Sequence, residues 1–374
     1  MSAIEVKFGK SFHPDAATAV QELVAQVSGI EPNFLIFFCS PKYDHVALGK
    51  AIAASFTCPV IGCTTAGEIL SGEGYIEGAI VCAAVASSRI SLRIFPIPDV
   101  IAFAGETDES EAELEAAFSS MDREKSFAIL LIDGLSMMEE LVIGRINKAS
   151  KGIPQIGASA GDGLNFQHTY VYYEGAFHEN AAVLAFFETT LPFMPLHIQH
   201  FESTDMRIVI TDADPATRTV MEINGLPACE GYAHAIDLAP EKLTPQVFAA
   251  HPLMLRIGGR YYVRSIQKAN PDGSLTFYCA IATGVILTVA KPVGKLSQNL
   301  ENSLTEIQKT MKPALILGSD CILRRLEMQR NNELEEMKHL LSRFPFIGFS
   351  TYGEQYYGVH VNHTLTALVL GDEA

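Results

Sequence analysis

Apolar residues follow one series of patterns that occurs three times along the chain. A fully apolar run comes first, at residues 34–39, 127–132 and 314–317. Apolar residues at helical spacing follow, such as Leu48, Ile52 and Phe56, which are four residues apart. A second apolar run ends each copy, at residues 79–86, 181–187 and 364–370. Continuous apolar runs are typical of strands that are buried on both faces, so each copy predicts a sheet covered by helices.

A short motif lies between the helical pattern and the second apolar run of every copy. The three motifs are PVIGCTTAGE at 59–68, PQIGASAGD at 154–162 and PFIGFSTYGE at 345–354. Each begins with a proline, which lacks an N–H group and disfavours helix in the residue before it, so the helix must end there. A further helix is predicted before the first run of each copy, near residues 20–27, 109–121 and 296–307.

These repeats predict an α/β protein of two related domains built from helix–strand–helix–strand–strand units, with mixed sheets covered by helices. We expect the first domain at residues 1–192 and the second at residues 200–374. The second and third motif prolines are roughly twice as far apart in sequence as the first and second. This spacing leaves open a degenerate fourth copy of the repeat near Pro252. Residues 219–281 contain short strand patterns and a turn at 270–273, so this stretch is expected to be antiparallel.

Charge and composition narrow the range of functions. The chain has 374 residues, with 27 Lys and Arg against 43 Asp and Glu, and a formal net charge of −16. Such an acidic chain repels phosphate groups, so neither nucleic acid nor an anionic membrane surface is an expected partner. No apolar stretch approaches the ~20 residues that a membrane-spanning helix needs. The seven cysteines form no C-x-x-C pattern and indicate free thiols in a reduced compartment, so we expect a cytoplasmic protein.

The second motif contains a G-x-S-x-G pattern centred on Ser159, which is typical of serine hydrolases. In those enzymes the serine opens a helix, whereas the residues that follow Ser159 have a strand pattern at 169–173. The other two motifs contain one extra residue in the turn, so a fixed nucleophile geometry is not repeated. A serine hydrolase that uses Ser159 is therefore a remote alternative, and we expect no catalytic residues.

The hydroxyl and carboxyl groups of the motifs have two interpretations. Ligands of α/β proteins usually bind at strand ends, where these groups could bind the carboxylate or ammonium group of a small molecule. The candidate ligand-binding residues are Thr64, Glu68, Ser159, Asp162, Ser350 and Glu354. Alternatively, the same side chains satisfy backbone N–H groups in turns. Recurrence in three copies favours the structural role, because a single site does not need three copies.

The histidines and one basic, aromatic stretch are the candidates for a cofactor site. None of the 11 histidines has the spacing of a metal motif. His197 and His200 lie at the expected domain junction and His251 precedes Pro252, and each could be an axial ligand to haem or an ordinary hydrogen-bonded histidine. The anion-binding candidates are Arg256, Tyr262 and Arg264, which could bind a carboxylate or a haem propionate or could simply form an exposed strand face.

The three motifs resemble the hallmark segments of FIST proteins, at residues 58–68, 156–162 and 348–354. Residues 218–228 and 262–266 resemble the start and middle of the C-terminal domain of that family. The resemblance covers nearly the whole chain and implies a FIST N-terminal and a FIST C-terminal domain in a ligand-binding signalling protein that is not an enzyme. One branch of the family consists of stand-alone haem proteins that sense nitric oxide and act on a partner histidine kinase.

The resemblance and the residues together predict a cytoplasmic stand-alone sensor that binds haem b, with nitric oxide as its signal and a histidine kinase as its partner in trans. His200 and His251 are the first candidates for the iron ligand, and His197 is the next. A sensor of an amino acid or a similar small metabolite, without haem, is the alternative. Whether the chain forms a homodimer is left open.

Overall fold

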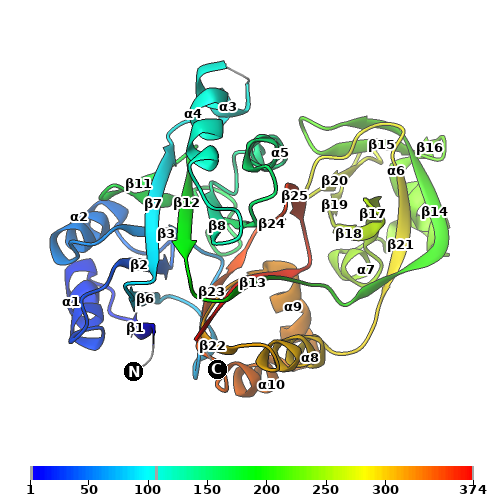
Figure 1. The fold of residues 1–374 in the computed structure, drawn as a ribbon. Helices are drawn as coiled ribbons and strands as arrows, with labels where there is room; N and C mark the ends of the chain where they lie inside the picture. Colours follow the sequence, from blue (N-terminus) through cyan, green and yellow to red (C-terminus); the bar gives the residue numbers. More distant parts are fainter. Residues whose placement is uncertain (1–2, 106–107, 373–374) are drawn as a thin grey trace.

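The fold is that of an α/β protein, as the repeats predict (Figure 1). The computed structural model describes residues 3–105 and 108–372. Within these ranges the strands form three six-stranded sheets and one eight-stranded sheet. The three six-stranded sheets are mixed, because each contains one parallel pair of strands among antiparallel neighbours.

Each repeated copy contributes four strands to one six-stranded sheet. The first copy contains β1 (Glu5–Ser11), α1 (Ala16–Gln26), β2 (Phe34–Cys39), α2 (His45–Ser55), β3 (Val60–Thr64) and β6 (Ile80–Ala86). The second contains β7 (Ile90–Ile97), α3 (Val100–Ala104), α4 (Asp108–Ser119), β8 (Ser126–Ile132), α5 (Glu139–Ser150), β9 (Gln155–Ser159) and β12 (Ala182–Thr189). The third contains β13 (Phe193–Ile198), α8 (Leu296–Gln308), β22 (Lys312–Cys321), α9 (Ile322–Asn331), α10 (Leu334–Leu341), β23 (Phe346–Thr351) and β26 (Leu365–Asp372). The predicted runs and helices of the repeats are confirmed, and each second helix ends before its motif proline.

The remaining two strands of each sheet come from a hairpin of another copy. The hairpins are β4 (Glu68–Leu70) with β5 (Gly74–Ile76), β10 (Val171–Tyr173) with β11 (Ala176–His178), and β24 (Glu354–Tyr356) with β25 (Val359–Val361). The first hairpin pairs with β23 of the third copy, the second with β3 of the first copy, and the third with β9 of the second copy. The three copies therefore exchange hairpins in a closed cycle, which joins the two ends of the chain into one body.

The glycine of each P-x-I-G motif lies where the two parallel strands of its copy approach each other. Gly62, Gly157 and Gly348 are registered opposite residues of β2, β8 and β22. A Cβ atom on Gly348 would lie 2.0 Å from the carbonyl oxygen of Gly318, and one on Gly62 would lie 2.5 Å from that of Phe37. Both distances are too short for a methyl group, so the close pairing of the strands accounts for the repeated glycine.

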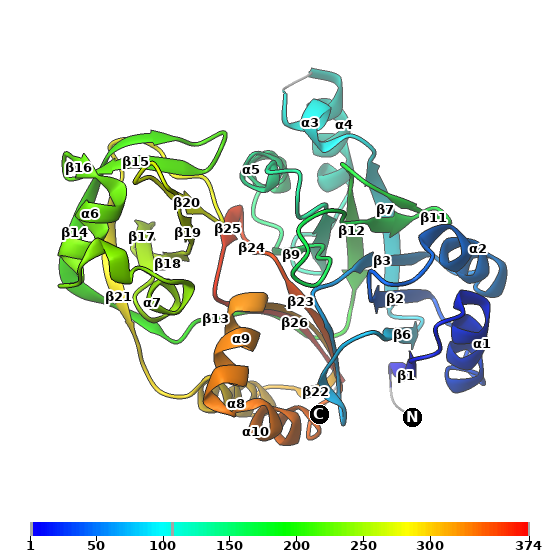
Figure 2. The same cartoon turned by 180° about the vertical axis from the view of Figure 1, so that it is seen from behind.

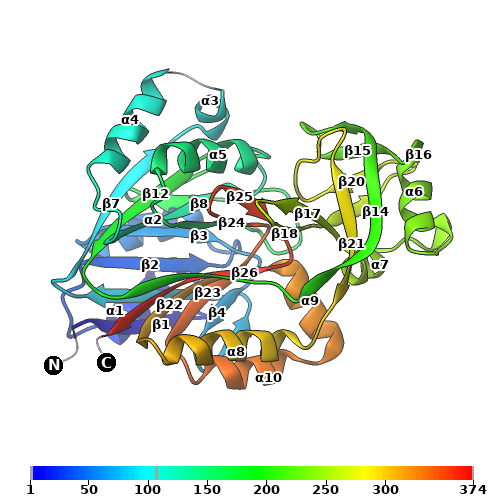
Figure 3. The ribbon, with the colours of Figure 1, turned by 45° about the vertical axis from the view of Figure 1, so that its right-hand side comes forward.

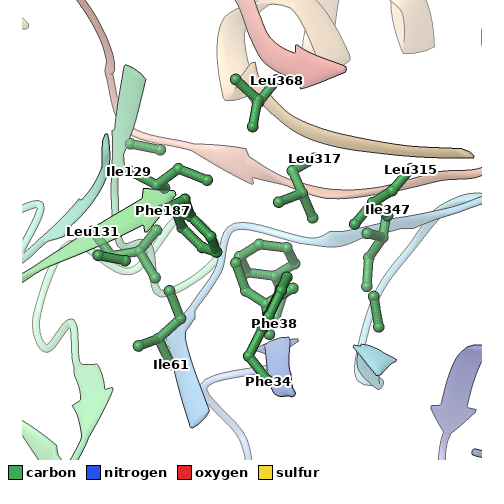
Figure 4. Packing of buried hydrophobic residues seen from close by; sticks show 14 of the residues in the cluster. Phe34, Phe38, Ile61, Ile129, Leu131, Phe187, Leu315, Leu317, Ile347 and Leu368 are labelled. Carbon is green, nitrogen blue, oxygen red and sulfur yellow. The ribbon is translucent and has the colours of Figure 1, made fainter. Parts of the chain in front are cut away.

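The main core lies among the three six-stranded sheets (Figure 4). Alternate residues of β2 point to opposite faces: Phe34 and Phe38 enter this core, whereas Phe37 faces helices α1 and α2. The rings of Phe34 and Phe187 join the first two copies at 5.2 Å, and those of Phe38 and Phe349 join the first and third copies at 4.5 Å. Because both strand faces are buried in this way, the strands read as continuous apolar runs.

A separate unit, residues 201–292, interrupts the third copy between β13 and α8 and stands beside the three-sheet body (Figures 2 and 3). Its elements are β14 (Phe201–Asp214), β15 (Thr219–Ile223), β16 (Leu226–Pro227), α6 (Ala228–Ala235), the 3-10 turn Pro240–Lys242, α7 (Pro245–Ala250), β17 (Leu253–Ile257), β18 (Arg260–Arg264), β19 (Ile266–Ala269), β20 (Leu275–Phe277) and β21 (Ile286–Pro292). Every strand pair in it is antiparallel. The antiparallel prediction is confirmed, and a fourth copy near Pro252 is wrong, because the repeat requires a parallel pair. We call residues 201–292 the inserted unit.

The inserted unit contacts the body through buried polar groups. The Arg218 guanidinium lies 2.6 Å from the Glu139 carboxylate at the first turn of α5. The Ala280 N–H donates to the Glu140 carboxylate at 2.7 Å, and the Arg264 guanidinium donates to the carbonyl of His360 at 2.6 Å. Among the described helices, none has both the length and the apolar composition needed to cross a membrane.

Candidate functional site

The three motif turns meet one another where the three copies join. The N–H of Ala66 in the first motif donates to the carbonyl of Ser350 in the third motif at 2.9 Å. The N–H of Gly161 in the second motif donates to the carbonyl of Thr64 in the first at 3.0 Å. The N–H of Ser159 donates to the carbonyl of Gly353 at 2.9 Å and completes the cycle. We call this arrangement the motif ring.

Two motif carboxylates have equivalent positions, and each accepts from the N–H group just before the next long strand. Glu68 accepts from the Thr65 hydroxyl at 2.6 Å and from the Ala79 N–H at 3.1 Å. Glu354 accepts from both the hydroxyl and the N–H of Thr364, at 2.6 and 3.2 Å. Each carboxyl therefore ties its hairpin to the start of the next long strand. Burial raises the pKa of Glu68 to about 7 and raises that of Glu354 well above its ordinary value.

The third motif carboxylate, Asp162, has a different environment. It accepts from the N–H groups of the loop at 166–168, at 2.8, 2.8 and 3.0 Å, and from the Tyr352 hydroxyl. Although burial opposes the effect, these hydrogen bonds lower the pKa of Asp162. All three carboxylates therefore perform the turn chemistry that was one interpretation of the motifs.

The motif hydroxyls are fully buried. The Thr64 hydroxyl accepts from the N–H of Tyr170 at 3.0 Å, and the Ser350 hydroxyl is buried without a hydrogen-bond partner. The Ser159 hydroxyl has 0% exposure and lies 3.4 Å from the Glu139 carboxylate and 3.1 Å from the Gln355 side-chain amide. Neither of these hydrogen-bond partners among residues 3–105 and 108–372 is a histidine, and β9 ends at Ser159 without opening a helix.

A cavity of about 400 Å³ opens beside the motif ring. Its wall contains Glu68 and Asp162 from the candidate ligand-binding residues, together with Arg325 of α9 and Lys42. The Arg325 guanidinium donates to the carbonyl of Ala66 at 2.8 Å and to the Glu77 carboxylate at 2.5 Å. Both signs of charge therefore line one cavity, which is an arrangement suited to a zwitterion. The other four candidates, Thr64, Ser159, Ser350 and Glu354, lie outside this lining.

A second cavity, of about 460 Å³, lies between the body and the inserted unit. His197 of β13 lines it from one side, and Tyr262, Met254 and Arg260 line it from the inserted unit. We call it the junction cavity. The His197 Nε2 atom is buried and has no hydrogen-bond partner. Burial, followed by the positive charges of Arg260 and Arg324, lowers the pKa of His197 to about 4, so the imidazole is neutral near pH 7.

The other cofactor candidates do not line the junction cavity. The His200 ring is buried, and its Nε2 atom lies 3.1 Å from the Glu327 carboxylate. His251 ends α7, where its carbonyl accepts from Tyr232. Arg256 is exposed and stacks against Tyr261, with 5.8 Å between the guanidinium carbon and the ring centre. Arg264 is buried in the contact with the body described above. Of the six predicted cofactor residues, the structure brings only His197 and Tyr262 together at this cavity.

Sequence reasoning missed Arg325 and Glu327, and it noted Arg260 in the basic, aromatic stretch without choosing it as a site residue. Arg325 and Glu327 lie two residues apart on α9, a helix with a hydrophilic sequence in which several residues are nevertheless buried. Arg260 follows the two glycines at 258–259 that form the turn between β17 and β18. None of these residues belongs to a repeated motif, so only the packing of the third copy and the inserted unit shows that they lie at the two cavities or beside them.

The repeated body, the inserted unit and the two cavities together define an α/β protein with cavities of a size suited to small molecules. The family model of the FIST N domain matches residues 33–226, and that of the FIST C domain matches residues 228–357. The chain therefore belongs to the FIST family. FIST domains are small-ligand sensory domains, which agrees with the resemblance of the motifs. The bounds predicted for the two domains stay a prediction.

No curated protein matches the chain in sequence. A cyanuric acid hydrolase from A. caulinodans is 10% identical, covers 50% of this chain and 71% of its own, and has a TM-score of 0.28. PurLQS from Thermotoga maritima is 10% identical, covers 99% of this chain and 72% of its own, and has a TM-score of 0.21. Phosphoribosylformylglycinamidine synthase II from Thermotoga maritima is 13% identical with the same coverages and a TM-score of 0.22. These scores are too low to support an inference about fold or function.

Proposed function

We propose that this chain is a sensory protein that binds its ligand in the junction cavity, and specifically that it binds haem b there and responds to nitric oxide. The observation that carries the proposal is the neutral, unpartnered Nε2 atom of His197 at a cavity of about 460 Å³. In the tautomer that has its proton on Nδ1, the neutral imidazole has a lone pair on Nε2, and such a nitrogen is an axial ligand that iron accepts. The volume lies within the range of ordinary ligand pockets.

The residues around His197 fit the rest of such a cofactor. Met254, Tyr262 and Phe201 supply apolar surface for a flat ring system. Arg260 is exposed at the same cavity, so its guanidinium could pair with a propionate. When bound, haem supplies an iron that takes up nitric oxide. The protein itself would hold the ring, orient the imidazole of His197 and exclude water from that imidazole.

The position of the cavity accounts for how a signal could leave the site. The junction cavity has one wall on the body and one on the inserted unit, so a ligand that binds one arrangement of the two more tightly shifts their equilibrium. A histidine kinase in trans is the proposed reader of that change. The proposal of a kinase partner rests on the resemblance of the motifs to the FIST family. The proposed location of the protein is the cytoplasm.

Visible absorption of the protein, expressed with a haem precursor, tests the proposal. We expect a Soret band near one haem per chain that shifts when nitric oxide is added to the reduced protein, and that is lost or strongly weakened in His197→Ala. His251→Ala serves as the matched control, because His251 lies outside the cavity lining and should keep the band. A protein that stays colourless when haem is titrated in, or a band carried equally by His197→Ala, would overturn haem binding at this cavity.

For the signalling step, autophosphorylation of a candidate histidine kinase is measured with and without the haem-loaded protein. We expect the rate to change when loaded protein is added and to change again when nitric oxide is supplied. An identical rate with loaded protein, with His197→Ala protein and with buffer for every candidate kinase would remove the partner from the proposal.

A second candidate function is a sensor of an amino acid, without haem, that uses the cavity at the motif ring. The observation that favours it is the presence of Arg325 and Lys42 together with Asp162, whose pKa is lowered, in one cavity wall. We expect a free amino acid to raise the melting temperature by mass action, and Lys42→Ala, at an exposed position, to weaken that response. A flat response across all amino acids would exclude this candidate.

The expectation that the chain is not an enzyme stays a prediction, with a serine hydrolase as its remote alternative. The Ser159 hydroxyl is 0% exposed, and its partners are an amide and the Glu139 carboxylate, which is itself paired with Arg218, so the hydroxyl is closed off from a substrate and lacks the histidine of a serine-hydrolase triad. Labelling with a fluorophosphonate checks this prediction. A label on wild-type protein that is absent from Ser159→Ala would show it to be wrong.

A further inference from the structure

Three side chains from distant parts of the chain converge behind the junction cavity. His200 lies between β13 and β14, where the chain enters the inserted unit; Glu327 lies on α9, and His363 lies between β25 and β26. The His200 Nε2 atom is 3.1 Å from one Glu327 oxygen, and the His363 Nε2 atom is 2.9 Å from the other. We call this group the His–Glu–His cluster.

The His–Glu–His cluster is buried and packed against an aromatic ring. The side chains of His200, Glu327 and His363 are 1%, 11% and 0% exposed. The ring of Phe201 packs against both imidazoles, with centres 4.1 Å and 4.8 Å apart. Asp320 and Arg324, which lie near enough to act on the cluster electrostatically, form their own fully buried ion pair. The cluster is therefore not a solvated group of surface charges.

The donor atoms already have a spacing that suits a metal ion. All three donor atoms lie within 4.8 Å of one another. Ligands at ~2.0–2.1 Å from a tetrahedral centre lie about 3.3 Å from each other, which is close to the two nitrogen–oxygen distances in the cluster. Two imidazoles and one carboxylate form a common ligand set for zinc and for other divalent first-row metals.

Hydrogen bonding alone leaves this cluster incompletely satisfied. If both imidazoles are neutral and donate from Nε2 to Glu327, the two Nδ1 atoms become buried acceptors, and neither has a hydrogen-bond partner. A cation would use both Nε2 lone pairs and one oxygen of Glu327. Each ring proton would then move from Nε2 to Nδ1, so that binding to the neutral rings releases no proton, and the two Nδ1 atoms stay without a partner in either state. The case for a metal ion therefore rests on the burial, convergence and spacing of the three donor atoms.

We propose that His200, Glu327 and His363 bind one divalent transition-metal ion, of the class that zinc represents, with a fourth position left for water. Such an ion would tie the point where the chain enters the inserted unit to α9 and to the loop before β26. The two parts that line the junction cavity would then be held in one relative position. The site is distinct from the haem proposal, because His197, not His200, lines the junction cavity.

Zinc binding to haem-free protein tests the inference independently of the proposed function. The protein is expressed without haem precursor, stripped with a chelator, dialysed and titrated with zinc, and the bound metal is measured by mass spectrometry. We expect one zinc per chain, and an affinity lower by at least about 10-fold in Glu327→Gln and in His363→Gln. The matched controls are Glu179→Gln and His168→Gln, which alter an exposed His–Glu pair and should bind as the wild type does.

A second measurement avoids dependence on variants that fail to fold. Cobalt(II) added to the stripped wild-type protein should give visible absorption bands of a four-coordinate nitrogen and oxygen site, and zinc should displace them. The inference is overturned if the wild type shows no saturable uptake of either metal, or if folded Glu327→Gln binds zinc as tightly as the wild type. Loss of the Soret band in His197→Ala with zinc uptake intact would separate the two sites.

Discussion

Replacement of Glu68 by glutamine should change how the stability of the protein depends on pH. Glu68 is 1% exposed, and burial raises its pKa in the folded state to about 7, against an ordinary value of 4.5. The folded state therefore keeps a proton between these two values that the unfolded chain releases. Since the folded state binds more protons in this range, stability falls as the pH rises.

The size of the effect follows from the two pKa values. The stabilising contribution of Glu68 is fully present below pH 4.5 and is lost as the pH rises through about 7. At ~1.4 kcal/mol per pKa unit, the part lost between about pH 5 and about pH 8 is roughly 2.5 kcal/mol. Glutamine resembles the protonated acid, because its oxygen can accept from the Ala79 N–H and its amide can donate to Thr65. The variant should therefore lack this pH dependence.

Urea unfolding of the wild type and Glu68→Gln at about pH 5 and about pH 8 measures the difference. We expect the variant to gain roughly 2.5 kcal/mol relative to the wild type between the two conditions. Glu354 and Asp320 also have raised pKa values, but they titrate in both proteins and cancel in the comparison. Glu31→Gln, at an exposed position, is the control. Stability curves of wild type and variant that stay parallel across this range would refute the reasoning.

Three further predictions concern stability and are checked by the same unfolding measurement. Gly348→Ala should cost about 1–3 kcal/mol or more, because its Cβ would lie 2.0 Å from the Gly318 carbonyl oxygen; a neutral effect would contradict the close strand pairing. Arg218→Ala should cost about 3–5 kcal/mol, because it leaves Glu139, whose side chain is 2% exposed, without its partner. A loss below about 1 kcal/mol would mean that this contact is not maintained in solution. Asp44→Ala should cost about 1 kcal/mol, because its carboxylate accepts from two N–H groups in the first turn of α2, and an unchanged midpoint would argue against that cap.

The repeated elements could be predicted because their signals are local. The run at 34–39 is β2 in full, and α2 ends at Ser55, before Pro59. The inserted unit was expected to be antiparallel from its turn residues, and that is confirmed. The fourth copy near Pro252 was wrong, because one proline and one Ile-Gly pair occur easily by chance within a β17–β18 hairpin.

Less of the candidate site than of the fold could be predicted from the sequence. His197 and Tyr262 were singled out as separate candidates, and the structure places them at one cavity. His200 was singled out as an iron ligand, but its Nε2 atom contacts Glu327, which lies 127 residues further along the chain. No spacing rule links residues so far apart, so their meeting could not be inferred.

The sequence by itself determined the secondary structure of the three copies, the ends of their helices and the turn chemistry of the motifs. These features depend on the sterics and hydrogen bonding of neighbouring residues, which act over a few positions. Only the tertiary structure decided that the copies exchange hairpins in a cycle, that the inserted unit closes a cavity over His197, and that His200, Glu327 and His363 converge. These features arise from long-range packing of buried surfaces, and the apolar pattern specifies which faces are buried without specifying the surface that each one meets.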